Sequence, residues 1–121
     1  MSEPSRPVVE SPALDVRDVP ARQRYEATTV GDAPSLAGLI DYERAAESLV
    51  LVHTEVLEDF AGQGVGSRLV RDVIADARER GLSVVPQCAF VVRWLRKHPD
   101  QQDVLAQPLE VPEDTRPPHP A

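Results

Sequence analysis

The chain has 121 residues, 41% hydrophobic and 27% charged, and its formal net charge is −7. This length suits one domain and leaves little room for a second hydrophobic core. The acidic balance disfavours nucleic acid and anionic membranes as partners, because both would repel the protein. The single cysteine, Cys88, excludes a disulfide framework and a zinc site built from several thiolates.

The two ends of the chain are rich in proline and acidic residues. Residues 1–21 and 106–121 have few bulky apolar side chains, so they lack the burial that offsets backbone ordering. We predict that both segments are disordered and that one folded domain spans residues 22–105. Nothing at the start resembles a signal peptide, and no apolar run approaches the roughly 20 residues of a membrane span. With its lone thiol, the protein is expected in the cytoplasm.

Three strands are predicted first, over residues 22–30, 36–44 and 48–57, joined by short polar turns into an antiparallel meander. In the third strand, strict alternation would place His53 and Glu55 on one face together with Leu49, Leu51 and Leu57. The other face would be apolar, apart from a threonine.

A helix, a strand and a second helix are predicted next. The apolar residues of 65–80 recur about every four positions, and Gly81 follows where a C-terminal cap is expected. A short apolar strand covers residues 82–85, and the second helix runs from Phe90 to about Lys97, where Pro99 stops it. Because strands flank the first helix, this part is a βαβ crossover with parallel strands. The fold class is therefore α/β, of the α+β type, with a mixed sheet.

Three alternate glycines, Gly62, Gly64 and Gly66, stand between the third strand and the first helix. Glycine permits a tight turn and a close ligand approach, and the first N–H groups of a helix have no intrahelical partner. Such a turn can hold a phosphate through main-chain donors, aided by the helix dipole. The spacing matches neither a dinucleotide fingerprint nor a P-loop. Residues 62–98 also carry seven cations and three anions, a local charge of +4, which favours a small anionic ligand.

Four segments together resemble the compact GNAT-like N-acetyltransferases, a subfamily of the GNAT superfamily of acetyl-CoA-dependent acyltransferases. They are His53-Thr54-Glu55-Val56, Gly62-Gln63-Gly64-Val65-Gly66, Pro86-Gln87-Cys88-Ala89-Phe90 and Arg96-Lys97-His98-Pro99. The resemblance covers about residues 22–105. It implies a twisted GNAT-like sheet in which the strands before the glycine turn and after the first helix splay apart to admit acetyl-CoA.

By this resemblance, the glycine turn binds the pyrophosphate of acetyl-CoA. The backbone N–H groups of residues 63–67 would form the cradle, Arg68 would add charge, and Val56 would line the pantetheine side; the residues concerned are Val56, Gln63, Gly64, Val65, Gly66, Ser67 and Arg68. The superfamily's first motif position, Arg or Gln, falls on Ala61. One side-chain contact is thereby lost, so weaker binding is expected.

Catalytic residues are expected on the third strand and after the last strand. An alkyl ammonium has a pKa of about 10.4, so presenting the free amine near neutral pH costs about 4 kcal/mol unless a base accepts the proton. Glu55, in a strand where several GNAT enzymes carry a glutamate base, and His53 are the candidates, unless they are an exposed carboxylate and a packed histidine. Cys88 matches the cysteine typical of the subfamily. It could relay the acetyl group covalently, line the cleft or belong to the core.

The function expected is acetyl-CoA-dependent N-acetyl transfer to a primary amine. The body is short for the superfamily, which implies an open acceptor site suited to an exposed amine of a protein, a peptide or a polyamine. A non-catalytic acyl-CoA-binding or interaction module is the alternative. The three histidines show no metal-site spacing, so no metal is expected. The oligomeric state is left open, with a monomer favoured.

Overall fold

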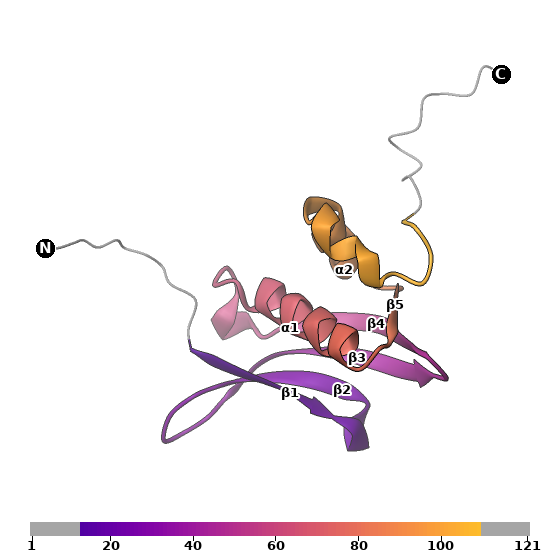
Figure 1. Ribbon diagram of the computed structural model, residues 1–121. Coiled ribbons are helices and arrows are strands. Elements are labelled where there is room, and N and C mark those ends of the chain that lie inside the picture. Colours follow the sequence, from indigo (N-terminus) through magenta and orange to yellow (C-terminus); the bar gives the residue numbers. More distant parts are fainter. Residues whose placement is uncertain (1–12, 110–121) are drawn as a thin grey trace, which may run out of the picture.

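The computed structural model of the protein describes residues 13–109, which form one sheet and two α-helices (Figure 1). The sheet has five strands in the order β1-β2-β3-β4-β5. The strands are β1 (Leu14–Val19), β2 (Arg24–Thr29), β3 (Leu36–Ala45), β4 (Ser48–Val56) and β5 (Ser83–Pro86). Neighbours are antiparallel from β1 to β4, and β5 lies parallel to β4. The predicted meander and the parallel crossover are both confirmed.

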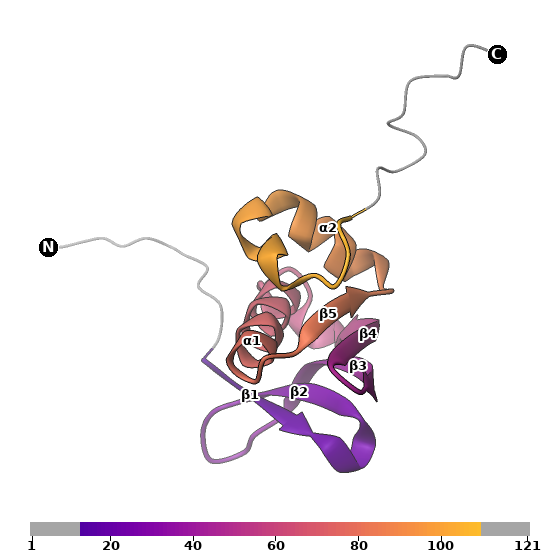
Figure 2. The same cartoon turned by 45° about the vertical axis from the view of Figure 1, so that its right-hand side comes forward.

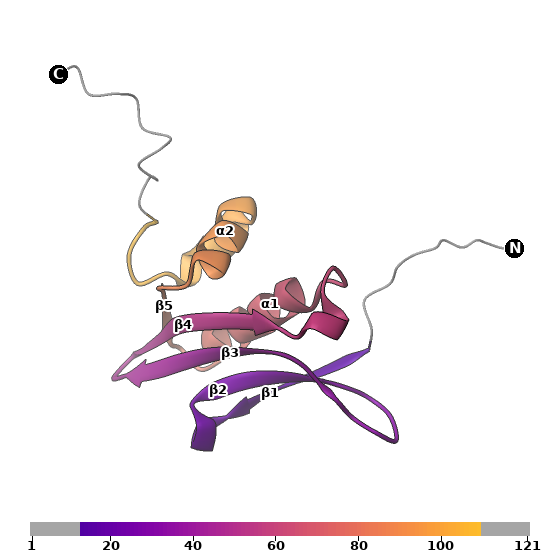
Figure 3. The same ribbon diagram turned by 180° about the vertical axis from the view of Figure 1, so that it is seen from behind.

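The two helices lie where the sequence predicts them. Helix α1 (Val65–Glu79) connects β4 to β5, and α2 (Ala89–Lys97) follows β5, with short 3-10 turns at Pro20–Arg22, Glu58–Phe60 and Pro99–Val104. Both helices lie over the same face of the sheet (Figures 1 and 2). The view from behind shows that neither α-helix of the described residues covers the opposite face of the sheet (Figure 3). The apolar stripe of α1 is fully buried against the sheet, at Val65, Leu69, Val70, Val73, Ile74 and Ala77.

The domain begins earlier than the sequence predicts. Residues 14–19, which were expected to be disordered, form strand β1 and pair along their whole length with β2. Leu14 is 6% exposed and joins the core, and Val16 packs against it, because alternate β1 residues point toward α1. At the other end, Ala106 donates its N–H to the Val84 carbonyl at 3.1 Å, so the expected C-terminal tail is ordered at its start. Residues 1–12 and 110–121 of the predicted tails lie outside the described residues.

A β-bulge in β4 changes which side chains share a face. Asp41 of β3 pairs with His53, and the next residue, Tyr42, pairs with Leu51, so Val52 is an extra residue on β4. Beyond the bulge, the side chains that follow the buried Leu51 are therefore those of Thr54 and Val56. His53 and Glu55 point to the face without helices. The predicted alternation was wrong here, because one inserted residue inverts every later side chain.

Strands β4 and β5 pair over only four residues each. Their ladder runs from Ser48 and Ser83 to Leu51 and Pro86, and ends where the Gln87 N–H donates to the Leu51 carbonyl at 2.9 Å. Strand β4 then continues to Val56, whereas the chain after β5 turns into α2. The two segments diverge from the bulge onward, as the GNAT resemblance implies.

Gly38 lets β3, β4 and α1 approach closely beneath this divergence. An added Cβ would lie 2.9 Å from the Glu55 carbonyl oxygen and 3.0 Å from side-chain atoms of Leu69 and Val65. We expect Gly38→Ala to lower the free energy of unfolding by about 1–3 kcal/mol, because backbone on one side cannot yield cheaply. Urea denaturation measures this. Glu43→Ala, an exposed control on the same strand, should stay within about 0.5 kcal/mol of wild type; equal stability of both variants would contradict the close packing.

Candidate functional site

The glycine turn leads from β4 into α1 through two left-handed residues. Gly62 has φ 77° and Gly64, the N-cap of α1, has φ 82°. Residues with a Cβ are strained in this region, so glycine is required at both positions. The turn delivers the start of α1 to the end of β4, beside the divergence from β5.

Four main-chain donors are available at this helix start. The first intrahelical bond runs from the Arg68 N–H to the Gly64 carbonyl at 3.0 Å, so the N–H groups of residues 64–67 have no partner within the helix. Gln63 differs, because its N–H donates to the Phe60 carbonyl at 3.3 Å. The predicted cradle thus contains four of its five donors, at Gly64, Val65, Gly66 and Ser67.

The side chain of Arg68 points away from this cradle. Its guanidinium pairs with Asp72 at 2.8 Å and donates to the Leu14 carbonyl at 3.2 Å. These contacts join α1 to β1 and neutralise the charge that the sequence assigned to a phosphate. Val56 lies on the helix-facing side of β4, opposite Gly38 in the ladder, and packs against the core beside the first turn of α1.

Helix α2 packs its first turns against the start of α1. The ring of Phe90 lies so close to Gly66 that an added Cβ would approach it to 2.5 Å. One turn later, the Trp94 indole N–H donates to the Ser67 hydroxyl at 2.9 Å. The third glycine of the turn is therefore needed for contact with α2 rather than for backbone conformation.

Cys88 is the N-cap of α2 and faces Thr54 across the divergence of β4 and β5. Its sulfur lies 3.3 Å from the Thr54 hydroxyl oxygen. Burial alone would raise the pKa of Cys88, but hydrogen bonds from the Thr54 hydroxyl and from backbone N–H groups at the start of α2 outweigh it. The pKa of the thiol is therefore below its ordinary value, which increases the thiolate fraction and its reactivity. The sequence of β4 alone gave no reason to select Thr54. Its contact with Cys88 depends on the parallel pairing of β4 with β5, which places the two residues opposite each other.

His53 and Glu55 form a separate pair on the other face of β4. The His53 Nε2 and a Glu55 carboxylate oxygen are 3.5 Å apart, and the two side chains are 55% and 54% exposed. The structure therefore brings the predicted catalytic residues into two groups. The thiol lies on the helix side of the sheet, and the carboxylate and imidazole lie on the open side.

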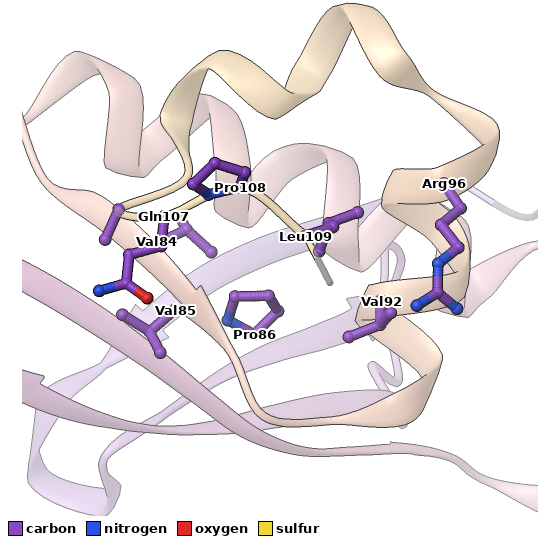
Figure 4. A pocket seen from close by; sticks show the side chains of 9 residues that line it. Val84, Val85, Pro86, Val92, Arg96, Gln107, Pro108 and Leu109 are labelled. Atoms are coloured by element: carbon purple, nitrogen blue, oxygen red, sulfur yellow. The ribbon is translucent and has the colours of Figure 1, made fainter. Parts of the chain in front are cut away.

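A cavity of about 440 Å³ lies elsewhere, at the outer edge of β5 (Figure 4). Pro86, Val92 and Leu109 form its apolar wall, and Arg96 stands at its side. None of the predicted site residues lines it. It belongs to the contact between β5, α2 and residues 106–109 and not to the divergence of β4 and β5.

Comparison with known proteins identifies the family. The model of the GCN5-related N-acetyltransferase family matches residues 24–104. The chain belongs to this family. Membership makes the protein an acetyltransferase, and GCN5-related N-acetyltransferases generally use acetyl-CoA as the acyl donor. A search of curated proteins gives no match.

A solved structure supports the same fold. The solution NMR structure of a GCN5-like protein from Staphylococcus aureus, provisionally assigned as an N-acetyltransferase, superimposes with a TM-score of 0.60 at 27% sequence identity. The match covers 85% of this chain and 97% of that one. Within residues 13–109, no helix is long and apolar enough to cross a membrane, and no cluster of histidine, cysteine and acidic side chains could hold a metal ion.

The contact between Thr54 and Cys88 makes a testable prediction about thiol reactivity. Thr54→Val removes the hydroxyl that stabilises the thiolate, so the pKa of Cys88 rises and alkylation begins at higher pH. The pH dependence of the iodoacetamide alkylation rate measures this. Thr54→Ser keeps the hydroxyl and should retain the wild-type profile; an unchanged profile in Thr54→Val would show that the hydroxyl does not act on the thiol.

Proposed function

We propose that the protein transfers an acetyl group from acetyl-CoA to the nitrogen of a primary amine, with the donor at the glycine turn and the acceptor on the open face of β4. The observation that carries this proposal is the juxtaposition of four main-chain donors, at residues 64–67, with the divergence of β4 and β5 that ends at Cys88. A diphosphate at the turn directs the pantetheine arm along β4, past Val56, toward Thr54 and Cys88.

The turn fits the diphosphate of acetyl-CoA by shape and charge. Gly64 adopts the left-handed conformation that opens α1 and carries no side chain there, and the positive end of the helix dipole attracts an anion. Acetyl-CoA supplies the thioester, whose carbonyl carbon accepts the amine. The chain's own residues hold the donor, admit the acceptor and accept a proton.

Glu55 is the proposed base, and His53 supports it. The Glu55 carboxylate accepts a proton from the acceptor ammonium, either directly or through water, and His53 lies close enough to share that proton. The free amine then forms the new N–C bond as the C–S bond of the thioester breaks. The second nitrogen proton leaves with the CoA sulfur, which balances the transfer.

Cys88 offers a second route for the acetyl group. Its thiolate can form an S–C bond to the acetyl carbon as the C–S bond to CoA breaks, and CoA leaves as a thiolate that takes a proton from water. The amine then forms the N–C bond, the Cys88 thiolate leaves, and Glu55 or water accepts the proton that the nitrogen loses. The lowered pKa of Cys88 favours this route. Direct transfer with Glu55 as base does not require it, and kinetics separate the two.

The acceptor proposed is an exposed amine of a protein, a peptide or a polyamine. His53 and Glu55 are about half exposed, and both lie on the face over which no described helix passes. An acceptor attached to a large molecule can reach such a face, whereas a small metabolite would find little enclosure. We place the reaction in the cytoplasm, where a lone reduced thiol persists.

Gly64→Asp tests the donor site. The substitution strains the left-handed turn and puts a carboxylate before the helix N-terminus, so acetyl-CoA binding should be lost at concentrations that saturate the wild type. Isothermal titration measures it. Gly31→Asp, also at a positive φ but in the exposed β2–β3 loop, should bind normally.

Ala61→Arg restores a cation at the superfamily's first motif position and should tighten binding. If neither Gly64→Asp nor Ala61→Arg changes affinity, the turn is not the donor site.

Glu55→Gln and Cys88→Ser test the two routes. We expect Glu55→Gln to lower kcat for amine acetylation by about 10²-fold, because the ammonium loses its base. Glu43 is an exposed glutamate of β3, near the end of that strand that lies away from Glu55. As the control, Glu43→Gln should leave kcat unchanged. If transfer is direct, Cys88→Ser remains active. If Cys88 relays the acetyl group, Cys88→Ser loses activity, and the wild-type protein gains the mass of one acetyl group on Cys88. If the wild type acetylates no amine above the uncatalysed background and neither variant changes this, a binding module is favoured over an enzyme.

A further inference from the structure

Two of the described arginines differ from most of the others in their partners. Within residues 13–109, six have a carboxylate oxygen within the range of an ion pair, namely Arg17, Arg22, Arg24, Arg68, Arg78 and Arg80. Arg71 and Arg93 have no such partner among these residues. Instead, each guanidinium lies 5.9 Å from the centre of an aromatic ring, Arg71 over Trp94 and Arg93 over Phe90.

The two rings are those that pack on the first turn of α1. Phe90 lies against Gly66, and the Trp94 indole N–H donates to the Ser67 hydroxyl at 2.9 Å. The ring of Trp94 is held further by His98, which stacks on it at 3.8 Å. Both cations are therefore carried on a rigid seam between α1 and α2, beside the four main-chain donors.

The helix geometry directs Arg71 toward the same place. Arg71 follows Ser67 by four residues, so the two share one face of α1, and helical side chains lean toward the N-terminus. Arg93 starts from α2 and reaches the seam from the other side over Phe90. Stacking on an aromatic face orients a guanidinium without consuming its hydrogen-bond donors, so its N–H groups remain available to a ligand.

The placement of Arg71 and Arg93 beside the main-chain donors favours the binding of an anion. Two cations near the positive end of a helix dipole repel one another, whereas six of the other described arginines lie beside a carboxylate. Four main-chain N–H groups suit one diphosphate. Acetyl-CoA carries a further group, the 3′-phosphate on its ribose, whose near-double negative charge needs cationic donors of its own.

We infer that Arg93 and Arg71 bind the 3′-phosphate of the acyl donor and thereby select CoA thioesters over their 3′-dephospho forms. The inference rests on the proposed use of acetyl-CoA at the glycine turn. It assigns the two arginines a role in donor specificity and none in the chemical step.

Isothermal titration of the full chain with acetyl-CoA and with acetyl-3′-dephospho-CoA tests the inference. The variants are Arg93→Gln and Arg71→Gln, with Arg44→Gln as a control of equal charge change. Arg44 pairs with Leu49 at the start of β4, the end remote from the glycine turn. Each of the first two variants should weaken acetyl-CoA binding about tenfold, as expected for one charge-assisted contact. Neither should alter the binding of the dephospho donor.

The outcomes separate this inference from the proposed function. If the wild type binds acetyl-CoA but Arg93→Gln and Arg71→Gln bind it as Arg44→Gln does, the inference fails alone. If both variants weaken the two donors equally, the arginines contact the diphosphate and the 3′-phosphate assignment is overturned. If the wild type binds neither donor, the proposed function fails and the inference falls with it.

Discussion

The short ladder between β4 and β5 is the constraint on which the candidate site depends. Main-chain hydrogen bonds join the strands only as far as Leu51 and Gln87, and the bulge at Val52 follows at once. Because the strands then diverge, β4 beyond Leu51 forms no ladder with β5, although it stays paired with β3 on its other side. Because the bulge inverts the later side chains, Thr54 faces Cys88 while Glu55 faces the open side. In the proposed transfer, the donor approaches from the helix side of β4 and the acceptor approaches from the open side.

The position of α1 is held by polar contacts as well as by its buried stripe. The Tyr25 hydroxyl donates to Asp76 of α1 and the Tyr42 hydroxyl donates to Asp18 of β1, each at 2.5 Å, while Arg80 pairs with both carboxylates. Burial and these carboxylates raise the pKa of Tyr42 to about 12 and that of Tyr25 further. Both phenols therefore remain protonated donors at neutral pH. This network anchors the C-terminal half of α1, so its N-terminus stays aimed at the divergence.

The distribution of charged side chains is also consistent with the proposed donor and acceptor sites. An acidic protein would repel a polyphosphate ligand unless its cations were concentrated where the ligand binds. The seam of α1 and α2 provides such a place, since its arginines rest on aromatic rings rather than on carboxylates. The open face of β4 instead presents a carboxylate and an imidazole, which suit an ammonium. This difference in charge between the two faces matches the two substrates of the proposed transfer.

The amino-acid sequence by itself determined the local elements, because periodicity, caps and turn residues act over a few positions. They are the glycine turn, helix α1, which begins at Val65, and helix α2, which lies between Cys88 and Pro99. The family resemblance added the divergence of the strands. Only the tertiary structure decided that residues 14–19 complete the sheet, that Val52 is a bulge, and that Phe90 lies on Gly66. Each of these depends on segments far apart in the chain, whose register and close packing no local pattern encodes.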